Sequence, residues 1–360
     1  MVTTILKASG SLDGAKTAAL VAEMTAGTIY SIDFSEVTDI NFAGLRALLR
    51  TRQSGMSFSV INACDDVAAK FEDSGVSSFI NVSRKAKAID LTQYDAFGEG
   101  YLSKALNSAD GDSMLKLYGP MVAKDLVIRE KMIARAVLRF GLNTPLAGSY
   151  YECGNSSAID FERIEGKRSF SRIISEEPER LEEITVRFAA MCKQLHSTQC
   201  DTAMFDDRTI FYHNAVASCK DISDELKAKA LEFVDNIPAA TTCLHGDLQL
   251  SNIINDGKED YWIDLADFGY GYPMLDLGMW YFLSKLNPER LTQHIFHLSK
   301  AQMDAIWDIF AREYFGADTD AKKEEVQRMV EPFAALHMIY LGSTFGFEPG
   351  MTDFIAHILL

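Results

Sequence analysis

Apolar residues in the first 82 positions alternate between a spacing typical of strands and a spacing typical of helices. Short apolar runs predict four buried strands, at residues 3–8, 28–34, 56–62 and 77–82. Between them, apolar residues three or four positions apart predict three helices, at 15–26, 42–53 and 66–75. This alternation predicts a small α/β domain at the N-terminus.

The pattern changes after a polar, basic stretch, SRKAKAID, and we place a domain boundary at residue 86. The next apolar runs predict five strands and one long helix, the strands at 93–97, 101–106, 113–119, 147–153 and 156–164 and the helix at 122–140. Helical spacing dominates the remainder. This order predicts an α+β bilobal, kinase-like fold with a small five-stranded N-lobe at 87–164 and a mostly helical C-lobe at 165–360.

Composition narrows the classes of partner. The chain has 360 residues and a formal net charge of -16, so a nucleic-acid partner is not expected, because phosphate backbones require a basic face. No apolar run approaches the roughly 20 residues that span a bilayer, and no signal peptide is evident. The six cysteines are scattered without a CxxC pair, which favours a reducing compartment. We therefore expect a cytoplasmic protein with no membrane partner.

The run HGDLQLSN carries the strongest chemical signal. It contains His245, Gly246, Asp247 and Asn252 in the spacing HGDxxxxN. Phosphoryl transfer needs a base that orients the attacking hydroxyl and a cation that neutralises phosphate charge. Asp247 is the candidate base, and the amide oxygen of Asn252 suits magnesium. His245 is expected to stabilise the loop through hydrogen bonds.

Two aspartates downstream compete for the role of metal ligand. Asp264 ends the apolar run YWID, whereas Asp267 belongs to the tripeptide Asp-Phe-Gly familiar from protein kinases. A carboxylate at the end of a strand is rigidly held, which suits a metal ligand. Asp276, near the start of the next helical pattern, could brace the catalytic loop by accepting hydrogen bonds from backbone N–H groups.

Together these segments resemble the aminoglycoside phosphotransferase and choline kinase superfamily of small-molecule kinases, over about residues 92–358. The hallmark is HGDxxxxN, an apolar strand ending in Ile-Asp, a Gly/Pro loop and a second Asp before a helix, here HGDLQLSN…WIDLADFGYGYPMLDL. In that family the Ile-Asp aspartate binds metal, and the later Asp lies about twelve residues on. Asp264 and Asp276 have that spacing and Asp267 does not. The resemblance therefore implies Mg²⁺ at Asn252 and Asp264.

The same resemblance implies a nucleotide site in the N-lobe. Lys116 on the third strand would bind the α- and β-phosphates of ATP, with GTP as an alternative donor, and Glu130 would hold Lys116 through an ion pair. The phosphates would be covered by Gly98 and Gly100. The adenine would be contacted by Phe161, Glu162 and Ile164.

Residues 3–82 resemble a STAS domain, the fold of anti-sigma-factor antagonists. The resemblance rests on GSLD at 10–13, on SIDFSEVTDINFAGLRALL at 31–49 and on a turn centred on Gly55. Family members commonly carry a phosphorylatable serine in the loop before the second helix. Phe42 and Ala43 occupy that place here, so the familiar phosphorylation switch is absent from this loop. Phe42 could instead contact a protein partner or pack locally.

The expected function is transfer of the ATP γ-phosphate to a hydroxyl group of a small molecule in a bacterial cytoplasm. The acceptor could be cationic, bound by C-terminal aromatic residues or by an acidic groove. The sequence leaves open an aminoglycoside, choline or a similar amino alcohol or sugar. A regulatory protein that senses nucleotide and docks a partner through the STAS domain is the main alternative. A protein kinase is a third, weakened because HGD replaces the usual HRD.

Overall fold

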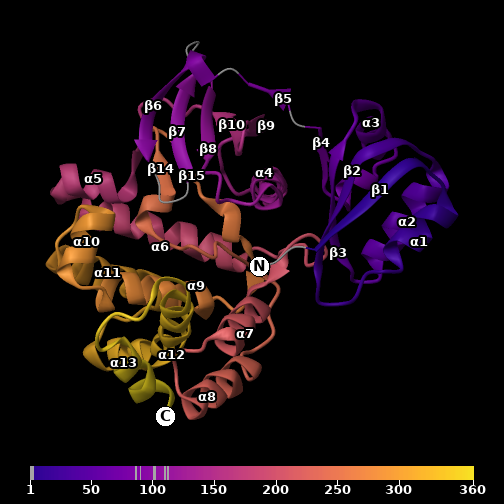
Figure 1. The fold of residues 1–360 in the computed structure, drawn as a ribbon. Coiled ribbons are helices and arrows are strands. Elements are labelled where there is room, and N and C mark those ends of the chain that lie inside the picture. The colour runs from indigo at the N-terminus through magenta and orange to yellow at the C-terminus, as the bar shows by residue number, and fades with distance from the viewer. Residues whose placement is uncertain (1–3, 86, 90, 100–102, 109–110, 112) are drawn as a thin grey trace. The chain divides into compact units, whose positions relative to one another are not determined.

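The computed structural model describes residues 4–85, 87–89, 91–99, 103–108, 111 and 113–360. The chain divides into two compact units, and Figure 1 labels their helices and strands. Unit 1 contains residues 1–139 and 145–164, and unit 2 contains residues 140–144 and 165–360. Unit 1 therefore includes both the N-terminal α/β segment and the strands that follow it up to Ile164.

Unit 1 begins with a parallel sheet whose strands follow the order β1-β2-β3-β4. Its strands are β1 (Thr4–Leu12), β2 (Ile29–Ile40), β3 (Ser57–Ala63) and β4 (Val82–Arg84), and its helices are α1 (Gly14–Val21), α2 (Phe42–Gln53) and α3 (Asp65–Asp73). Apolar side chains from the sheet and the helices form one core. The prediction for the fourth strand was wrong in position: residues 76–78 form a 3₁₀ turn, and pairing begins only at Val82.

The starts of α1 and α2 follow from their capping residues. The Asp13 carboxylate accepts a hydrogen bond from the N–H of Lys16 at 2.9 Å, and the Asn41 side chain accepts one from the N–H of Gly44 at 3.0 Å. Each side chain therefore satisfies a backbone donor that has no partner within its helix. Polar residues at these two positions fix where each parallel strand gives way to a helix.

The second sheet of unit 1 has the strand order β5-β9-β10-β8-β7-β6. Its strands are β5 (Lys87–Ala88), β6 (Tyr94–Glu99), β7 (Ser103–Ser108), β8 (Ser113–Tyr118), β9 (Ala147–Cys153) and β10 (Ser156–Glu162). The expected five strands are present and antiparallel, but the sheet has six. The sixth, β5, comes from the polar stretch assigned to the domain boundary, and it pairs in parallel with β9 through backbone groups that need no apolar side chains.

Helix α4 (Lys124–Val137) packs on the second sheet and ends before Gly141, which has φ +71°. Ile61 of β3 joins a buried cluster with residues of this helix and sheet, among them Val127 and Ile128. Arg139 donates a hydrogen bond to the carbonyl oxygen of Ser78 at 3.1 Å. The N-terminal α/β domain thus contacts α4 within unit 1.

Unit 2 is mainly helical, as expected for a C-lobe. Its helices are α5 (Phe170–Glu176), α6 (Leu181–Ser197), α7 (Arg208–Ser218), α8 (Asp224–Asp235), α9 (Met274–Tyr281, continued by a π-helical turn to Leu286), α10 (Glu289–Phe296), α11 (Lys300–Phe315), α12 (Asp320–Phe345) and α13 (Met351–Leu359). Aromatic rings join α6, α9 and α11 in the core, with Phe188 5.0 Å from Trp280 and 5.3 Å from Phe310.

Two small sheets in unit 2 carry the segments that hold the candidate chemistry. One contains β11 (Arg168–Ser169), β14 (Ile253–Asn255) and β15 (Asp260–Trp262), and the other contains β12 (Asp206–Asp207), β16 (Gly269–Gly271) and β13 (Thr242–Leu244). Strand β13 leads into the HGD loop, and β15 leads into Asp264. These pairings bring segments distant in sequence to one region of unit 2.

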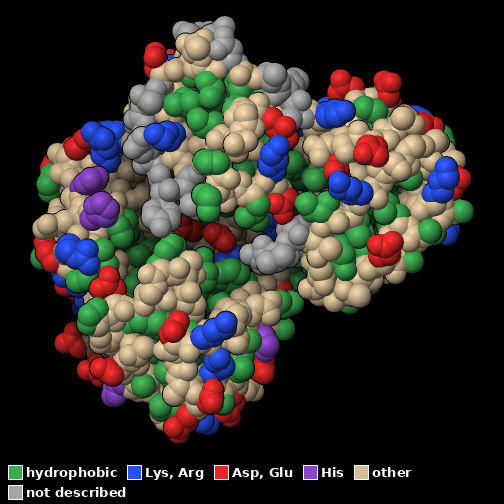
Figure 2. Space-filling model, viewed as in Figure 1, with side chains coloured by type: hydrophobic (Ala, Val, Ile, Leu, Met, Phe, Trp, Pro, Cys, Tyr) green, Lys and Arg blue, Asp and Glu red, His purple; other side chains and the backbone are tan. Residues whose placement is uncertain are grey.

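The surface carries both signs of charge. Figure 2 shows acidic and basic side chains interspersed over the visible face of each unit. Among the described residues, no helix combines the length and the hydropathy needed to cross a membrane.

Candidate active site

The HGD loop is held by its own histidine. His245 is fully buried, and its Nε2 lies 3.1 Å from the carbonyl oxygen of Ile263 while its Nδ1 accepts from the N–H of Asp247 at 3.3 Å. His245 therefore joins the loop to the end of the β14–β15 hairpin.

Asp276 fixes the same loop from α9. Its carboxylate accepts hydrogen bonds from the N–H groups of His245 at 2.7 Å and Gly246 at 2.9 Å. Its Oδ2 also lies 3.2 Å from Nε2 of His196, whose Nδ1 is 2.8 Å from the hydroxyl of Tyr314. Burial acts to raise the pKa of Asp276, but the hydrogen bonds and charges of His196 and His245 outweigh it and leave this pKa lowered. The bracing carboxylate is thereby kept ionised.

Asp247 lies in a polar cradle formed by its own loop. The side-chain amide of Gln249 donates to its Oδ1 at 3.1 Å and its Oδ2 at 3.0 Å, and Asn252 donates to Oδ2 at 2.8 Å. Burial raises the pKa of Asp247, and the charges of Asp264 and Asp267 raise it further, whereas His245 and Asn252 oppose the shift. A carboxylate with a raised pKa is a stronger base than an ordinary aspartate.

Asn252 and Asp264 are brought together by the β14–β15 hairpin. Ile263 donates its N–H to the carbonyl oxygen of Asn252 at 2.9 Å, so Asp264 follows directly after this pairing. Asp264 has φ +61° and ψ +51°, a left-handed conformation that costs energy for a residue with a Cβ. Strained backbone of this kind is concentrated at functional sites.

The donor set suits a hard cation. Asn252 uses its NH₂ group to donate to Asp247, which leaves its amide oxygen as the atom for a cation, and Asp264 supplies a carboxylate. Within the described ranges, no group of three or more His, Cys, Asp or Glu side chains is arranged to hold a metal ion. Asn252 and Asp264 are the residues that would hold a Mg²⁺ ion here.

Asp267 lies against the catalytic loop, although its spacing does not match the family's metal ligand. Its carbonyl oxygen and Cβ approach Gly246 so closely that a Cβ at position 246 would overlap them, and Gly246 has φ +80°. Its Oδ1 accepts a hydrogen bond from Nη1 of Arg208 at 3.2 Å. The Asp-Phe-Gly aspartate is thus beside the site and paired with an arginine.

In unit 1, Nζ of Lys116 on β8 lies 2.7 Å from Oε1 of Glu130 on α4. The side chains are 16% and 8% exposed, so water screens this ion pair only weakly. Lys116 pairs across the sheet with Ile159 of β10. The nucleotide-binding role of this ion pair remains a prediction.

The other described candidates of the N-lobe lie in strands or shortly after them. Gly98 lies inside β6, beside a bulge in its pairing with β7, rather than in the connection between the strands, and Gly100 lies outside the described residues. Phe161 and Glu162 end β10, and the N–H of Glu162 donates to the carbonyl oxygen of Leu146 at 2.8 Å. That N–H is therefore engaged within unit 1, whereas the described structure gives no hydrogen bond for the N–H of Ile164.

Three residues of the site were missed in the sequence. Gln249 occupies an unspecified position of HGDxxxxN, although its place two residues after Asp247 could have suggested a contact. His196 and Arg208 lie far from the motif in sequence and carry no local signal. Only the packing of α6 and the pairing of β12 with β16 bring these two residues to Asp276 and Asp267.

Comparison with known proteins assigns the family. Residues 96–306, more than half of the chain, match the phosphotransferase enzyme family. The chain belongs to the phosphotransferase enzyme family. This phosphotransferase is accordingly an enzyme that acts on hydroxyl groups of small molecules. The family therefore favours an enzyme over a regulatory protein that only senses nucleotide. No curated protein matches the phosphotransferase in sequence.

Solved structures share the fold of the phosphotransferase at low identity. The apo form of a thermostable mutant of aminoglycoside phosphotransferase APH(4)-Ia is 14% identical with a TM-score of 0.51, covering 74% of this chain and 93% of that chain. APH(4)-Ia itself is 14% identical with a TM-score of 0.50, covering 81% of this chain and 98% of that chain. A thermostable mutant of the same enzyme in ternary complex with ADP and hygromycin B is also 14% identical with a TM-score of 0.50, covering 74% of this chain and 92% of that chain. These likenesses establish the aminoglycoside phosphotransferase fold.

Proposed function

We propose that the protein transfers the γ-phosphate of ATP to a hydroxyl group of a small molecule in a Mg²⁺-dependent reaction. The observation that carries this proposal is the Asp247 carboxylate, which is oriented by two side-chain amides and has a raised pKa. The ternary complex of an APH(4)-Ia mutant with ADP and hygromycin B supports a nucleotide and a small-molecule acceptor as the two substrates. GTP is the alternative donor.

In the proposed reaction the acceptor oxygen attacks the γ-phosphorus. The bond between that phosphorus and the oxygen bridging to the β-phosphate breaks, ADP leaves, and Asp247 takes up the proton of the hydroxyl. The Gln249 and Asn252 amides hold the carboxylate in one orientation, so little reorganisation is needed when the acceptor binds. His245 and Asp276 act indirectly by fixing the loop backbone.

Asn252 and Asp264 would hold the magnesium ion, and Lys116, held by Glu130, would bind the nucleotide phosphates. When bound, Mg²⁺ neutralises charge on the transferring phosphate. The left-handed backbone at Asp264 supports a functional demand on that position. The backbone of Gly98 and the end of β10 remain candidates for phosphate and adenine contacts.

We further propose that the N-terminal domain is a STAS domain that docks a protein partner. Phe42 at the start of α2 supports this role, because its side chain is 81% exposed and thus does not pack locally. Phe42→Ser should leave the free energy of unfolding within about 0.5 kcal/mol of the wild type, as expected for an exposed position. A loss of several kcal/mol would show instead that Phe42 has a packing role.

The experiment for the main proposal is an ADP-release screen against hydroxyl compounds with Mg²⁺ present, using wild type, Asp247→Ala and Asp247→Asn. Both variants should lose about 10²–10⁴-fold in turnover on the identified acceptor, the usual range for a positioned base. Nucleotide affinity should remain largely intact. Asp308→Asn, on the exposed face of α11, is the matched control. Near-normal turnover by Asp247→Ala would refute the assignment of the base.

A further inference from the structure

The proposed reaction gives no role to Asp267, which lies beside the catalytic loop. Its backbone packs on Gly246, which places its Cβ next to the loop that carries Asp247. Its charge contributes to the raised pKa of Asp247, as expected for a carboxylate near that loop. Asp267 therefore lies close enough to the candidate base to contact a molecule bound there.

The Asp267 side chain is anchored on one side and open on the other. Oδ1 accepts from Arg208, whose side chain is only 4% exposed and whose guanidinium lies 3.9 Å from the centre of the Phe211 ring. The Asp267 side chain remains 46% exposed, and among the described residues Oδ2 has no hydrogen-bond partner. A buried arginine thus holds in place a carboxylate whose second oxygen is free.

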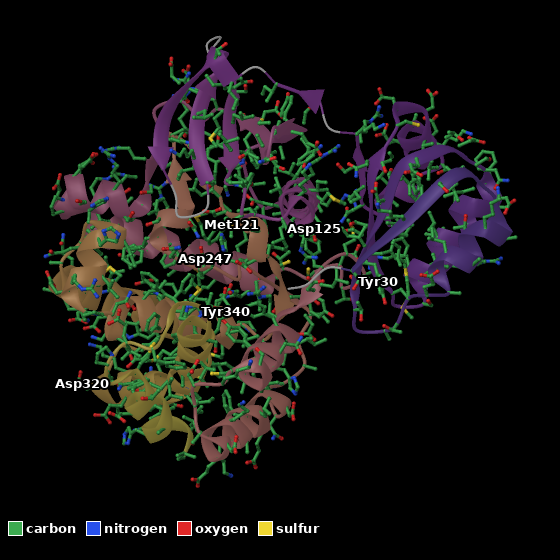
Figure 3. The ribbon with its side chains drawn as sticks, in the orientation of Figure 1. Tyr30, Met121, Asp125, Asp247, Asp320 and Tyr340 are labelled. Carbon is green, nitrogen blue, oxygen red and sulfur yellow. The ribbon has the colours of Figure 1, made fainter. Side chains whose placement is uncertain are left out.

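A tyrosine from the last long helix lies at the same place. Figure 3 shows Tyr340, on α12, close below Asp247 in the same unit. Burial raises the pKa of Tyr340, and the charges of Asp267 and Asp247 contribute in the same direction. The Tyr340 ring packs 4.9 Å from that of Phe211, edge to face. Tyr340 thus lies near enough to both carboxylates for their charges to affect its pKa.

We propose that Asp267 is an acceptor-binding residue that selects acceptors carrying a protonated primary amine. Its free Oδ2 accepts a hydrogen bond from the ammonium group, while Arg208 holds Oδ1 and so fixes the orientation of the carboxylate. The hydroxyl of the same molecule is thereby directed to Asp247. This inference rests on the proposed phosphotransfer function and assigns to it a class of acceptor and the residue that selects it.

The arginine distinguishes this role from metal binding. A guanidinium bonded to one carboxylate oxygen repels a divalent cation at the other, whereas a single positive charge on an amine is repelled less and can donate a directed hydrogen bond. A primary ammonium also has three N–H donors, which a quaternary amine lacks. The geometry therefore favours a primary amine over both Mg²⁺ and a quaternary ammonium group.

The test uses pairs of acceptors that differ only in an amine. Ethanolamine is compared with ethylene glycol and glucosamine with glucose, and choline serves as the quaternary probe. Values of kcat/KM, the KM for ATP and the Mg²⁺ concentration for half-maximal rate are measured for wild type, Asp267→Asn and Asp267→Glu, with Asp308→Asn as control. Circular dichroism and thermal unfolding check that each variant is folded.

For each pair of acceptors of which the wild type phosphorylates at least one member, we expect a higher kcat/KM for the amine. Asp267→Asn should lower kcat/KM for the amine by about 10- to 100-fold more than for its neutral partner, the range of a hydrogen bond to a charged group. Asp267→Glu keeps the charge and should retain the preference. The KM for ATP and the Mg²⁺ dependence should not change.

Three results would overturn the inference. The first is an equal kcat/KM of the wild type for the amine and for its neutral partner. This result is obtained with the wild type alone. The second is an equal loss on both members of a pair in a folded Asp267→Asn protein. The third is a shift in Mg²⁺ dependence, which would make Asp267 a metal ligand. If ATP binds but no hydroxyl compound is phosphorylated, the proposed function itself fails, and the inference fails with it.

Discussion

The carboxylate of Asp276 accepts a hydrogen bond from the backbone N–H of His245 at 2.7 Å, across 31 positions of sequence. Its other oxygen accepts from Gly246 at 2.9 Å, so one buried side chain satisfies two donors of the catalytic loop. Replacing one oxygen by an NH₂ group in Asp276→Asn would set two donors against each other. We expect the free energy of unfolding to fall by about 1–3 kcal/mol, the cost of an unsatisfied buried donor.

Turnover of Asp276→Asn should also fall, by about 10- to 100-fold, because the loop that positions Asp247 loses its support. Urea denaturation and steady-state kinetics measure the two effects, with Asp308→Asn as the control. A variant with lower stability but unchanged kcat would show that Asp276 supports the fold and not the position of the base.

Gly246 and Gly257 offer a matched pair of substitutions. Both have positive φ, +80° and +96°, but a Cβ at Gly246 would overlap the backbone of Asp267, whereas a Cβ at Gly257 would meet nothing within 4 Å. Each substitution by alanine incurs the left-handed penalty of about 1–2 kcal/mol. Gly246→Ala should additionally displace the loop, so it should be the less stable variant by thermal unfolding and the only one to lose activity. Equal losses in both variants would contradict the close approach.

The left-handed backbone of Asp264 predicts that two variants lacking the carboxylate are equally inactive but differ in stability. Asp264→Ala and Asp264→Gly both remove the carboxylate, so both should lose most Mg²⁺-dependent turnover. Glycine adopts φ +61° without steric cost, whereas alanine does not. The glycine variant should therefore be more stable than the alanine variant by about 1 kcal/mol in chemical denaturation. A more stable alanine variant would indicate that the backbone at this position is not strained.

His337 on α12 predicts a pH dependence of stability. The residue is buried, and its Nδ1 lies 3.3 Å from the hydroxyl of Tyr212. Burial, together with the charge of Arg208, lowers the pKa of His337 from 6.5 to about 3, although Asp276 opposes the shift. Between these two values the unfolded chain binds a proton that the folded protein does not. The free energy of unfolding should therefore decrease as the pH falls from 7 to 4.

Replacement of His337 by glutamine removes this titrating group. In denaturation experiments at a series of pH values, stability should fall less steeply with decreasing pH for His337→Gln than for the wild type. Identical slopes would show that His337 does not remain neutral in the folded protein over this range.

Most elements of the fold could be predicted from local pattern. The α/β alternation before residue 83 and the strands around Lys116 follow from apolar periodicity, which each segment carries by itself. In unit 1 the exceptions are short: β4 overlaps the predicted strand only at Val82, and β5 pairs through its backbone in a polar stretch. Pairing that is independent of apolar side chains leaves no periodic signal in the sequence.

The sequence by itself determined the order and spacing of the chemical groups: HGDxxxxN, Asp264 after its strand, and Asp276 twelve residues later. Those distances along the chain are short, so local turns and a single hairpin suffice to bring Asn252 and Asp264 together. Only the tertiary structure decided the partners of the aspartates. Arg208 meets Asp267, and His196 meets Asp276, because strand pairing and helix packing bring together segments about 60 to 80 residues apart. Such contacts depend on the packing of the whole unit, which no local pattern specifies.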